Sequence, residues 1–275
     1  MKRRVILILF FIVAFYLTGC SSYEPIIIAH RGNSGYAPEN TEAAVKSAWQ
    51  VKADAVEVDV HITKDDQVVV LHDGNTKRTS GEDFVVENCS YADIASLDVG
   101  SHKGWHFRNE RIPLLKDIID TVPEGKQLFV EVKCSERIIP FLKDIFSKSG
   151  KIQQLCIISF NLELLGKAKK VMPQVPMYWL ASPRKAEGGE YLPFDAEYIQ
   201  SAKKHGLDGL NLSYGMLSES FVKQVHKNGL ELFVWTVNYL PDAERMRAWG
   251  VDGITTNYPA DVLMIFDNNS GCYEN

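Results

Sequence analysis

The feature that most constrains the fold is a regular alternation of short apolar runs with helix-like segments. The runs are rich in β-branched residues, and helix candidates with good N-caps or first-turn prolines lie between them. Alternation of this kind predicts a parallel sheet covered by helices rather than a sandwich. The candidate strands are 26–29, 55–60, 68–71, 128–133, 155–160, 176–180, 209–212, 232–237 and 253–255.

Three helix-to-strand junctions late in the chain repeat one pattern. Gly206, Gly229 and Gly250 each stand where a helix should end. Such regularity favours a closed barrel over an open doubly wound sheet. Without a leader of about 20 residues, the chain has roughly the length of one eight-stranded barrel. We therefore predict the α/β fold of a TIM (β/α)8 barrel, as a single domain over residues 24–275.

One long segment, which we name the insertion, breaks this rhythm. It spans about residues 74–111, follows the strand carrying His72, and is polar and rich in Gly, Asn, Ser and Asp. Long loops are often functional, but they can also be simple excursions. We give equal weight to an insertion that caps the active face and to a plain surface excursion.

The amino terminus has the three-part layout of an export signal. A basic segment at 2–4 precedes an apolar run at 5–17, and a Thr-Gly-Cys sequence ending at Cys20 follows. The run is too short to span a bilayer comfortably, so a membrane-spanning anchor is the weaker alternative. We expect residues 1–20 to be a lipoprotein signal peptide. A lipidated Cys20 would then hold an exported protein on a membrane of the bacterial cell envelope, at the periplasm or the surface.

The net charge argues against a nucleic-acid-binding surface, and the spacing of the cysteines argues against a metal cluster. The formal charge is −5, and the chain has no basic stripe or tail, which argues against a nucleic-acid partner. Export would permit disulfides, but the wide spacing suggests no metal cluster, and strand alternation argues against pairing Cys134 with Cys156. We interpret the four remaining cysteines as packing residues: Cys89, Cys134, Cys156 and Cys272.

Acidic residues at strand positions of equal parity indicate a metal site. Glu57 and Asp59 stand two apart and share one face of a strand, and Glu131 and Lys133 repeat this spacing later. A half-exposed edge strand would explain the first pair alone. In a parallel barrel both faces are covered, so inward acidic pairs need a cation. Oxygen ligands favour one hard divalent cation, Mg²⁺ or Ca²⁺, over zinc.

Two histidines and two cations complete the candidate site. His30 and Arg31 follow the first strand, at the end where barrel active sites lie. A histidine there is more often structural, but His72 ends another apolar run, and two histidines beside a metal indicate acid–base catalysis. Arg31 and Lys133 supply positive charge for an anionic substrate, and arginine suits a bidentate grip on phosphate.

Seven motifs, in this order and across almost the whole mature chain, resemble those of the glycerophosphodiester phosphodiesterases. Parts of the insertion also resemble that family, at Arg78-Thr79-x-Gly81 and Ile112-Pro113-Leu114. The seven motifs are His30-Arg31-Gly32, Glu39-Asn40-Thr41, Glu57-x-Asp59, Leu71-His72-Asp73, Glu131-x-Lys133, Val234-Trp235-Thr236-Val237-Asn238 and Thr256-Asn257-x-Pro259.

The resemblance implies hydrolysis of glycerophosphodiesters to glycerol 3-phosphate and an alcohol. In that family the substrate's own glycerol hydroxyl attacks phosphorus and water opens the cyclic phosphate, although direct attack by water fits these residues equally. The implied roles are an acid–base pair (His30, His72), metal ligands (Glu57, Asp59, Glu131), phosphate binding (Arg31, Lys133) and an apolar wall for glycerol (Trp235).

Two alternatives stay open. A related phosphodiesterase acting on glycerophosphoinositol or lysophospholipids would share the metal site, and the insertion and the loops near Tyr178 and Tyr214 would set its specificity. The other alternative is an inactive surface lipoprotein that binds a ligand or partner.

Three further residues have two interpretations each. His61 shares the parity of Asp59 and so is a candidate to approach the metal, but a loop histidine is the favoured interpretation. Phe160 and Trp179, near strand ends, are candidates to line the pocket, but core packing is the commoner role of aromatic residues there.

Overall fold

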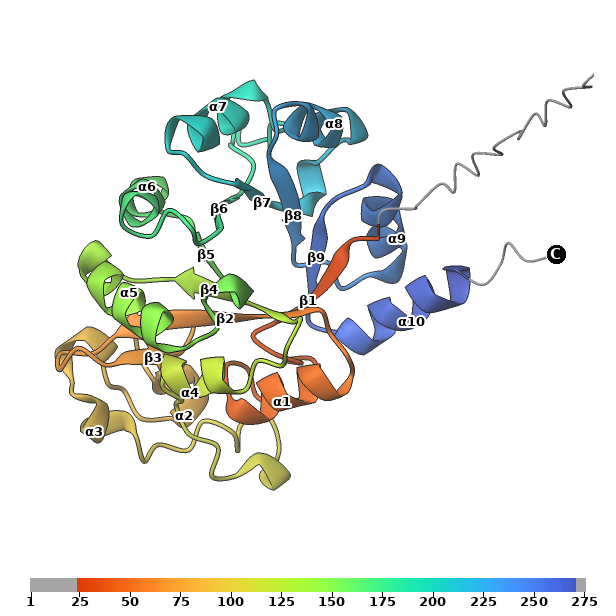
Figure 1. Ribbon diagram of the computed structural model, residues 1–275. Helices are drawn as coiled ribbons and strands as arrows, with labels where there is room; N and C mark the ends of the chain where they lie inside the picture. Colours follow the sequence, from red (N-terminus) through yellow and green to blue (C-terminus); the bar gives the residue numbers. More distant parts are fainter. Residues whose placement is uncertain (1–23, 271–275) are drawn as a thin grey trace, which may run out of the picture.

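The computed structural model of the protein describes residues 24–270. Within these residues nine strands form one sheet, and eight of them are parallel and close into a barrel because β1 pairs with both β9 and β2 (Figure 1). The predicted TIM barrel is confirmed. In pairing order its strands are β1 (Ile26–His30), β2 (Ala55–Ile62), β4 (Gln127–Val132), β5 (Leu155–Ser159), β6 (Met177–Ala181), β7 (Gly209–Ser213), β8 (Glu231–Trp235) and β9 (Gly253–Thr256).

Helices surround the barrel (Figure 1). Four of them begin at a polar side chain that accepts a bond from a first-turn N–H: Thr41, Asn161, Asp195 and Ser218. The three glycines predicted to end helices all have positive φ angles. The surrounding helices are α1 (Glu42–Gln50), α4 (Leu115–Asp120), α5 (Ile139–Lys148), α6 (Leu162–Val171), α7 (Ala196–Lys204), α8 (Glu219–Lys227), α9 (Leu240–Trp249) and α10 (Pro259–Ser270).

Strand alternation sorts the apolar side chains into two cores. Outward-facing residues such as Val56, Val58 and Val130 pack against the helices and are fully buried. Inward-facing residues form a plug inside the barrel. The plug consists of Ile28, Ala55, Phe129, Cys156, Ile158, Tyr178, Leu180 and Phe233.

The strand β3 (Val68–Val70) lies outside the barrel and runs antiparallel to β2. The prediction of a parallel strand at 68–71 is therefore wrong. Residues 63–67 alone connect β2 to β3, whereas a parallel crossover needs about a dozen residues or more. Asp66, with a φ of 64°, lies in this tight turn.

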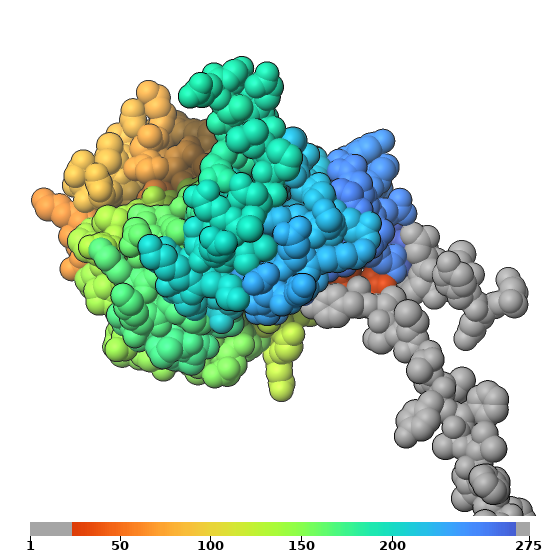
Figure 2. Space-filling view, turned by 90° about the horizontal axis from the view of Figure 1, so that it is seen from above, coloured from red at the N-terminus to blue at the C-terminus, as the bar shows by residue number. Residues whose placement is uncertain are grey.

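The insertion builds a small core of its own. Val86, Ile94 and Ile112 are buried there against Val69 of β3 and Leu71. Figure 2 shows the insertion, in orange to yellow, and the β6–α7 loop, in teal, projecting from the same end of the barrel. The insertion contains α2 (Lys77–Ser80), η1 (Val86–Asn88), α3 (Tyr91–Ile94) and η2 (Trp105–Phe107); the other short turns are η3 (Glu136–Ile138), η4 (Ile152–Gln154) and η5 (Tyr214–Met216).

Some sequence predictions concern parts of the chain that lie outside the described residues. The predicted signal peptide with Cys20, and Cys272, are among them. Among residues 24–270, no helix has the length and apolar character needed to cross a membrane. Cys89, Cys134 and Cys156 are free thiols, and Cys156 is part of the plug, where burial raises its pKa.

Candidate active site

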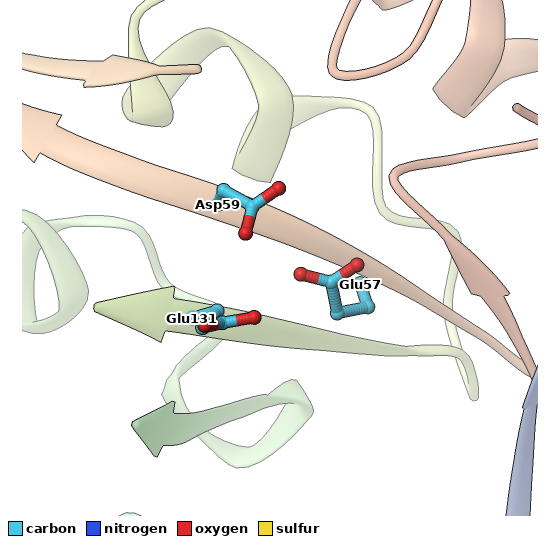
Figure 3. Close-up of side chains that lie close together, drawn as sticks. All are labelled: Glu57, Asp59 and Glu131. Carbon is cyan, nitrogen blue, oxygen red and sulfur yellow. The ribbon is translucent and has the colours of Figure 1, made fainter. Parts of the chain in front are cut away.

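Three carboxylates converge inside the barrel near the ends where the strands finish (Figure 3). The parallel register of β2 and β4 places Asp59 beside Glu131, and Glu57 lies two residues earlier on the same face of β2. One oxygen of each residue lies within 4.8 Å of the other two. All three residues are buried, with exposures of 2%, 0% and 7% for Glu57, Asp59 and Glu131.

The surrounding side chains leave this acidic cluster partly unsatisfied. Glu57 Oε1 and Asp59 Oδ1 are buried and accept no hydrogen bond. Burial and the nearby Asp59 raise the pKa of Glu57 well above its usual value, and that of Glu131 to about 7. Buried carboxylate oxygens without partners are costly. This all-oxygen donor set therefore fits a hard divalent cation.

Asn40 fixes the position of Asp59. Its amide nitrogen donates to Asp59 Oδ2 at 2.8 Å, and its amide oxygen accepts from the Asp59 backbone N–H at 3.1 Å. Asn40 has a φ of 58°, a left-handed conformation that asparagine tolerates better than most residues. Asn40 thus holds Asp59 Oδ2, while Oδ1 accepts no hydrogen bond and lies 3.6 Å from Lys133 Nζ.

The turn after β1 positions Arg31. Its backbone N–H donates to Glu57 Oε2 at 2.9 Å, its Nε lies 3.2 Å from Asp59 Oδ2, and its Nη1 donates to Glu39 at 3.0 Å. The turn needs a glycine next, because a Cβ on Gly32 would lie 2.5 Å from the carbonyl carbon of Ala44. Close packing of the turn on α1 therefore holds the arginine against the carboxylates.

His30 carries its proton on the nitrogen that faces away from the carboxylates. Its Nδ1 lies 2.7 Å from Asn257 Oδ1, which also accepts from Ser34 Oγ at 3.0 Å. An amide oxygen can only accept, so Nδ1 donates and Nε2 has a lone pair. Nε2 lies 3.9 Å from Glu57 Oε2. Burial and the charge of Arg31 lower the pKa of His30 to about 4.

His72 reaches the site because β3 returns antiparallel along β2. The Leu71 N–H donates to the Asp59 carbonyl at 3.0 Å, which brings the next residue level with the carboxylates. His72 Nδ1 lies 2.6 Å from Asp73 Oδ1. On the other side of the ring, Lys133 Nζ lies 3.2 Å from His72 Nε2 and donates to Glu131 at 2.9 Å.

These side chains line one cavity of about 200 Å³. Trp235 forms part of its wall, where the indole Nε1 donates to the Asn211 carbonyl at 3.0 Å and the ring meets Phe160 edge to face at 5.5 Å. Asp59 lies fully buried beside the cavity. The predicted site residues that line the cavity are His30, Arg31, Glu57, His72, Glu131, Lys133 and Trp235.

Comparison with known proteins decides the family. Residues 30–261 match the model of the glycerophosphoryl diester phosphodiesterase family. The chain belongs to this family. It is similar to the glycerophosphodiester phosphodiesterase of Caldanaerobacter subterraneus subsp. tengcongensis, with 33% identity over 245 residues that cover 87% of this chain and 97% of the relative.

Two further relatives bear on the chemistry of the phosphodiesterase. A solved structure of an Oleispira antarctica phosphodiesterase in complex with the product sn-glycerol-3-phosphate has a TM-score of 0.81 and 26% identity, covering 90% of this chain and 98% of that one. A lysophospholipase D of Mus musculus is 25% identical over 273 residues, covering 88% and 86% of the two chains. The chain is therefore a hydrolase of glycerophosphodiesters rather than an inactive binding protein.

Several residues of the phosphodiesterase site had no role in the sequence analysis. Glu39, Asn40 and Asn257 stood in recognised motifs, but their partners lie far away in the chain, so only the folded barrel reveals what they hold. Phe160, for which packing was favoured over a place in the pocket, lines the cavity and is 47% exposed. Its place directly after β5 was the available signal, since barrel active sites collect such positions.

Two sequence interpretations are wrong. His61 is a buried residue of β2, not a loop histidine, and its Nε2 bonds the His72 carbonyl at 3.1 Å. Tyr178 does not mark a loop at the mouth of the phosphodiesterase, because β6 begins at Met177 and Tyr178 faces the barrel interior near its amino-terminal end. There its hydroxyl donates to Glu231 at 2.6 Å.

Proposed function

We propose that the chain hydrolyses glycerophosphodiesters to glycerol 3-phosphate and an alcohol, with one Mg²⁺ or Ca²⁺ held by Glu57, Asp59 and Glu131. The observation that carries the proposal is the set of three converging carboxylates, two of whose buried oxygens, Glu57 Oε1 and Asp59 Oδ1, accept no hydrogen bond. When bound, the cation would polarise a phosphoryl oxygen and offset the charge that develops on phosphorus. Side chains of this chain bind the phosphate and transfer the protons.

Arg31 and Lys133 bind and orient the phosphate. Both cations are held by carboxylates, Arg31 by Glu39 and Asp59 and Lys133 by Glu131, so they are positioned before substrate arrives. Positioning in advance avoids reorganisation during the reaction. Trp235 offers an apolar wall against the glycerol carbons.

His30 and His72 transfer the protons. The Nε2 lone pair of His30 takes the proton of the attacking hydroxyl, either the substrate's own glycerol hydroxyl or water. Asp73 accepts from His72 Nδ1 and so stabilises the doubly protonated imidazolium of His72, which gives its Nε2 proton to the departing alkoxide and becomes neutral, with its remaining proton on Nδ1. In a route through a cyclic phosphate, the two imidazoles exchange roles in the second step.

The test is release of glycerol 3-phosphate by protein lacking residues 1–20. Glycerophosphocholine, glycerophosphoethanolamine and glycerophosphoinositol serve as substrates, each with Mg²⁺, Ca²⁺ or excess chelator. We expect release that needs a cation and that ranks the three headgroups. Folded protein that releases nothing under any condition would contradict the proposal.

Lysophospholipids are a second candidate substrate class, favoured by a hollow beside the cavity. This hollow of about 290 Å³ shares Phe160 and Leu180 with the cavity, and its walls are mostly apolar. Trp179 and Tyr198 stack in it at 5.5 Å, a surface suited to an acyl chain. Ser201→Phe would fill the hollow, so it should lower kcat/KM for lysophosphatidylcholine and spare glycerophosphocholine. Equal effects on both substrates would remove this candidate.

We also propose that the protein is exported and anchored to the cell envelope through a lipidated Cys20. Support comes from the layout of residues 1–20 alone. In a bacterial host, Cys20→Ala should abolish labelling with radioactive palmitate and move the protein from the membrane fraction to the soluble fraction. Unchanged labelling and membrane attachment in the variant would contradict the anchor.

A further inference from the structure

A chain of charged contacts links the two histidine-bearing segments of the site. From one side, Asp73 bonds His72, and its second oxygen accepts from Arg78 Nε at 2.7 Å. From the other side, Glu39 bonds Arg31. Arg78, which belongs to α2 in the insertion, touches both carboxylates and so joins the two halves.

The bond between Arg78 and Glu39 is a two-pronged one. Nη1 donates to Glu39 Oε2 and Nη2 to Oε1, each at 2.8 Å, while Nε is left for Asp73. A guanidinium can satisfy two carboxylates in this way because its donors are fixed in one plane, whereas a lysine ammonium cannot. The geometry therefore requires arginine at this position.

The carboxylates on either side of Arg78 are stably ionised. Burial alone would raise the pKa of Glu39, but the bonds from Arg78 and the charge of Arg31 lower it to about 2. The bond from Arg78 also lowers the pKa of Asp73 to about 2. The side chains of Glu39 and Asp73 are 18% and 30% exposed, so solvent screens these contacts only in part.

The short helix that carries Arg78 is held rigidly. The Thr76 side chain accepts from the Phe84 N–H at 3.2 Å and donates to the Glu82 carbonyl, and Ser80 Oγ donates to the Thr76 carbonyl at 2.8 Å. Thr79 is buried beneath the turn. Arg78 thus extends from a fixed turn rather than from a loose loop.

We propose that Arg78 is a positioning residue: it orients His72 through Asp73 and Arg31 through Glu39, and so fixes the insertion against the catalytic cavity. Arg78 does not line the cavity, so it acts through the residues it holds. The catalytic part of this inference rests on the proposed function, since it needs His72 and Arg31 to act on a phosphodiester.

The first test compares Arg78→Ala and Arg78→Lys with Lys77→Ala in the full-length protein. Lys77 is the matched control, because it lies on the same helix, is 68% exposed at its side chain and forms its ion pair with the exposed Asp83, away from the cavity. We expect both Arg78 variants to lower kcat roughly 10- to 100-fold, with a much smaller change in KM, since orientation rather than binding is lost. Lys77→Ala should stay within about twofold of wild type.

Chemical rescue separates positioning from a general loss of structure. Added guanidinium chloride at low millimolar concentration should restore part of the kcat of Arg78→Ala, and an equal concentration of ammonium chloride should not. Arg78→Ala and Asp73→Asn should also be non-additive, because they break one connected network. A kcat for Arg78→Ala within about twofold of wild type, or additive losses, would overturn the proposal.

A second measurement keeps the proposal testable without the reaction. The Nδ1 proton of His72, held by Asp73, should give a protected imidazole N–H signal in ¹H–¹⁵N spectra of wild-type protein and of Lys77→Ala. We expect Arg78→Ala to lose that signal while its other imidazole signals persist. A signal that survives in Arg78→Ala would overturn the positioning role, even if the wild-type protein acts on no glycerophosphodiester.

Discussion

The plug and the catalytic cavity are built by the same strands and share Ile158 and Leu180, but the rest of the plug is mostly apolar whereas the cavity collects charged side chains. In β2, Ala55 belongs to the plug and Glu57 to the cavity; in β4, Phe129 belongs to the plug and Glu131 to the cavity. Each cavity residue follows its plug residue by two positions. The same step separates Ile28 from His30 and Phe233 from Trp235.

The position of a residue along its strand, rather than the choice of strand, decides whether its side chain stabilises the barrel or takes part in the chemistry. Strand geometry sends residues i and i+2 to the same face, so one step of two residues moves a side chain from the plug to the cavity. Below, the aromatic rings of Phe129, Tyr178 and Phe233 lie 4.5 to 5.9 Å apart. Above the plug, the charged side chains of the cavity pack on these apolar residues.

The largest effect on activity should come from a change in the catalytic cavity, which forms the upper layer of the barrel interior; the plug forms the lower layer. We expect His30→Ala to lower kcat by about 10² to 10⁴, because an acid–base residue contributes this much, and to leave the melting temperature almost unchanged. Steady-state kinetics and thermal unfolding measure the two quantities. If activity persists in His30→Ala, the assignment of the acid–base pair is wrong.

A substitution in the plug should instead lower stability and leave activity largely intact. Phe129→Ala removes a fully buried ring from the plug, and we expect it to lower the free energy of unfolding by about 3 to 5 kcal/mol. The properly folded fraction should retain most of its kcat, since Phe129 does not line the cavity. Denaturant unfolding and active-site-normalised kinetics test this. Full loss of kcat in folded protein would mean that the two layers are not separable.

A cavity substitution should change the free energy of unfolding by a smaller amount than Phe129→Ala, and in the opposite direction. With chelator present, Glu57→Gln should be as stable as wild type or up to about 1 to 2 kcal/mol more stable, because it removes a buried carboxylate beside Asp59 and Glu131. It should nevertheless be poorly active with either cation. A marked loss of stability in chelator would show that the charge of Glu57 supports the fold.

The smallest effect belongs to the bottom of the plug. Tyr178→Phe deletes one hydrogen bond to Glu231, and we expect a loss of about 1 kcal/mol without any change in kcat or KM. Thermal unfolding and steady-state kinetics check both parts. A change in substrate preference would restore the idea that Tyr178 acts on specificity.

The sequence predicts the barrel and the inward carboxylates because both follow from local rules. Parity along β2 and β4 is enough to bring Glu57, Asp59 and Glu131 to one face, and the confirmed barrel then brings His30 beside them. These relations need only strand periodicity and the order of strands. The sequence is therefore sufficient to predict the barrel and the convergence of these carboxylates with His30.

Contacts between side chains on different loops do not follow from strand periodicity and were not predicted. Arg78 and Glu39 are 39 residues apart and meet only because the β2–β3 hairpin folds the insertion back along β2. The same hairpin, not the end of a parallel strand, delivers His72. The predicted strand 176–180 agrees with β6 within one residue, so Tyr178 near its start was predictable at the amino-terminal end of the barrel, away from the loops of the active face.

The proposed cation site is tested most directly by thermal unfolding of wild type and Glu131→Gln during titration with Mg²⁺ or Ca²⁺, starting in chelator. Ligand that binds only the folded state stabilises it by about 2.7 kcal/mol at one hundred times Kd. We predict that the wild-type melting temperature rises with at least one cation and that Glu131→Gln shows no rise. A wild-type melting temperature that ignores both cations, together with activity that survives chelator, would contradict a cation site in the upper layer of the barrel.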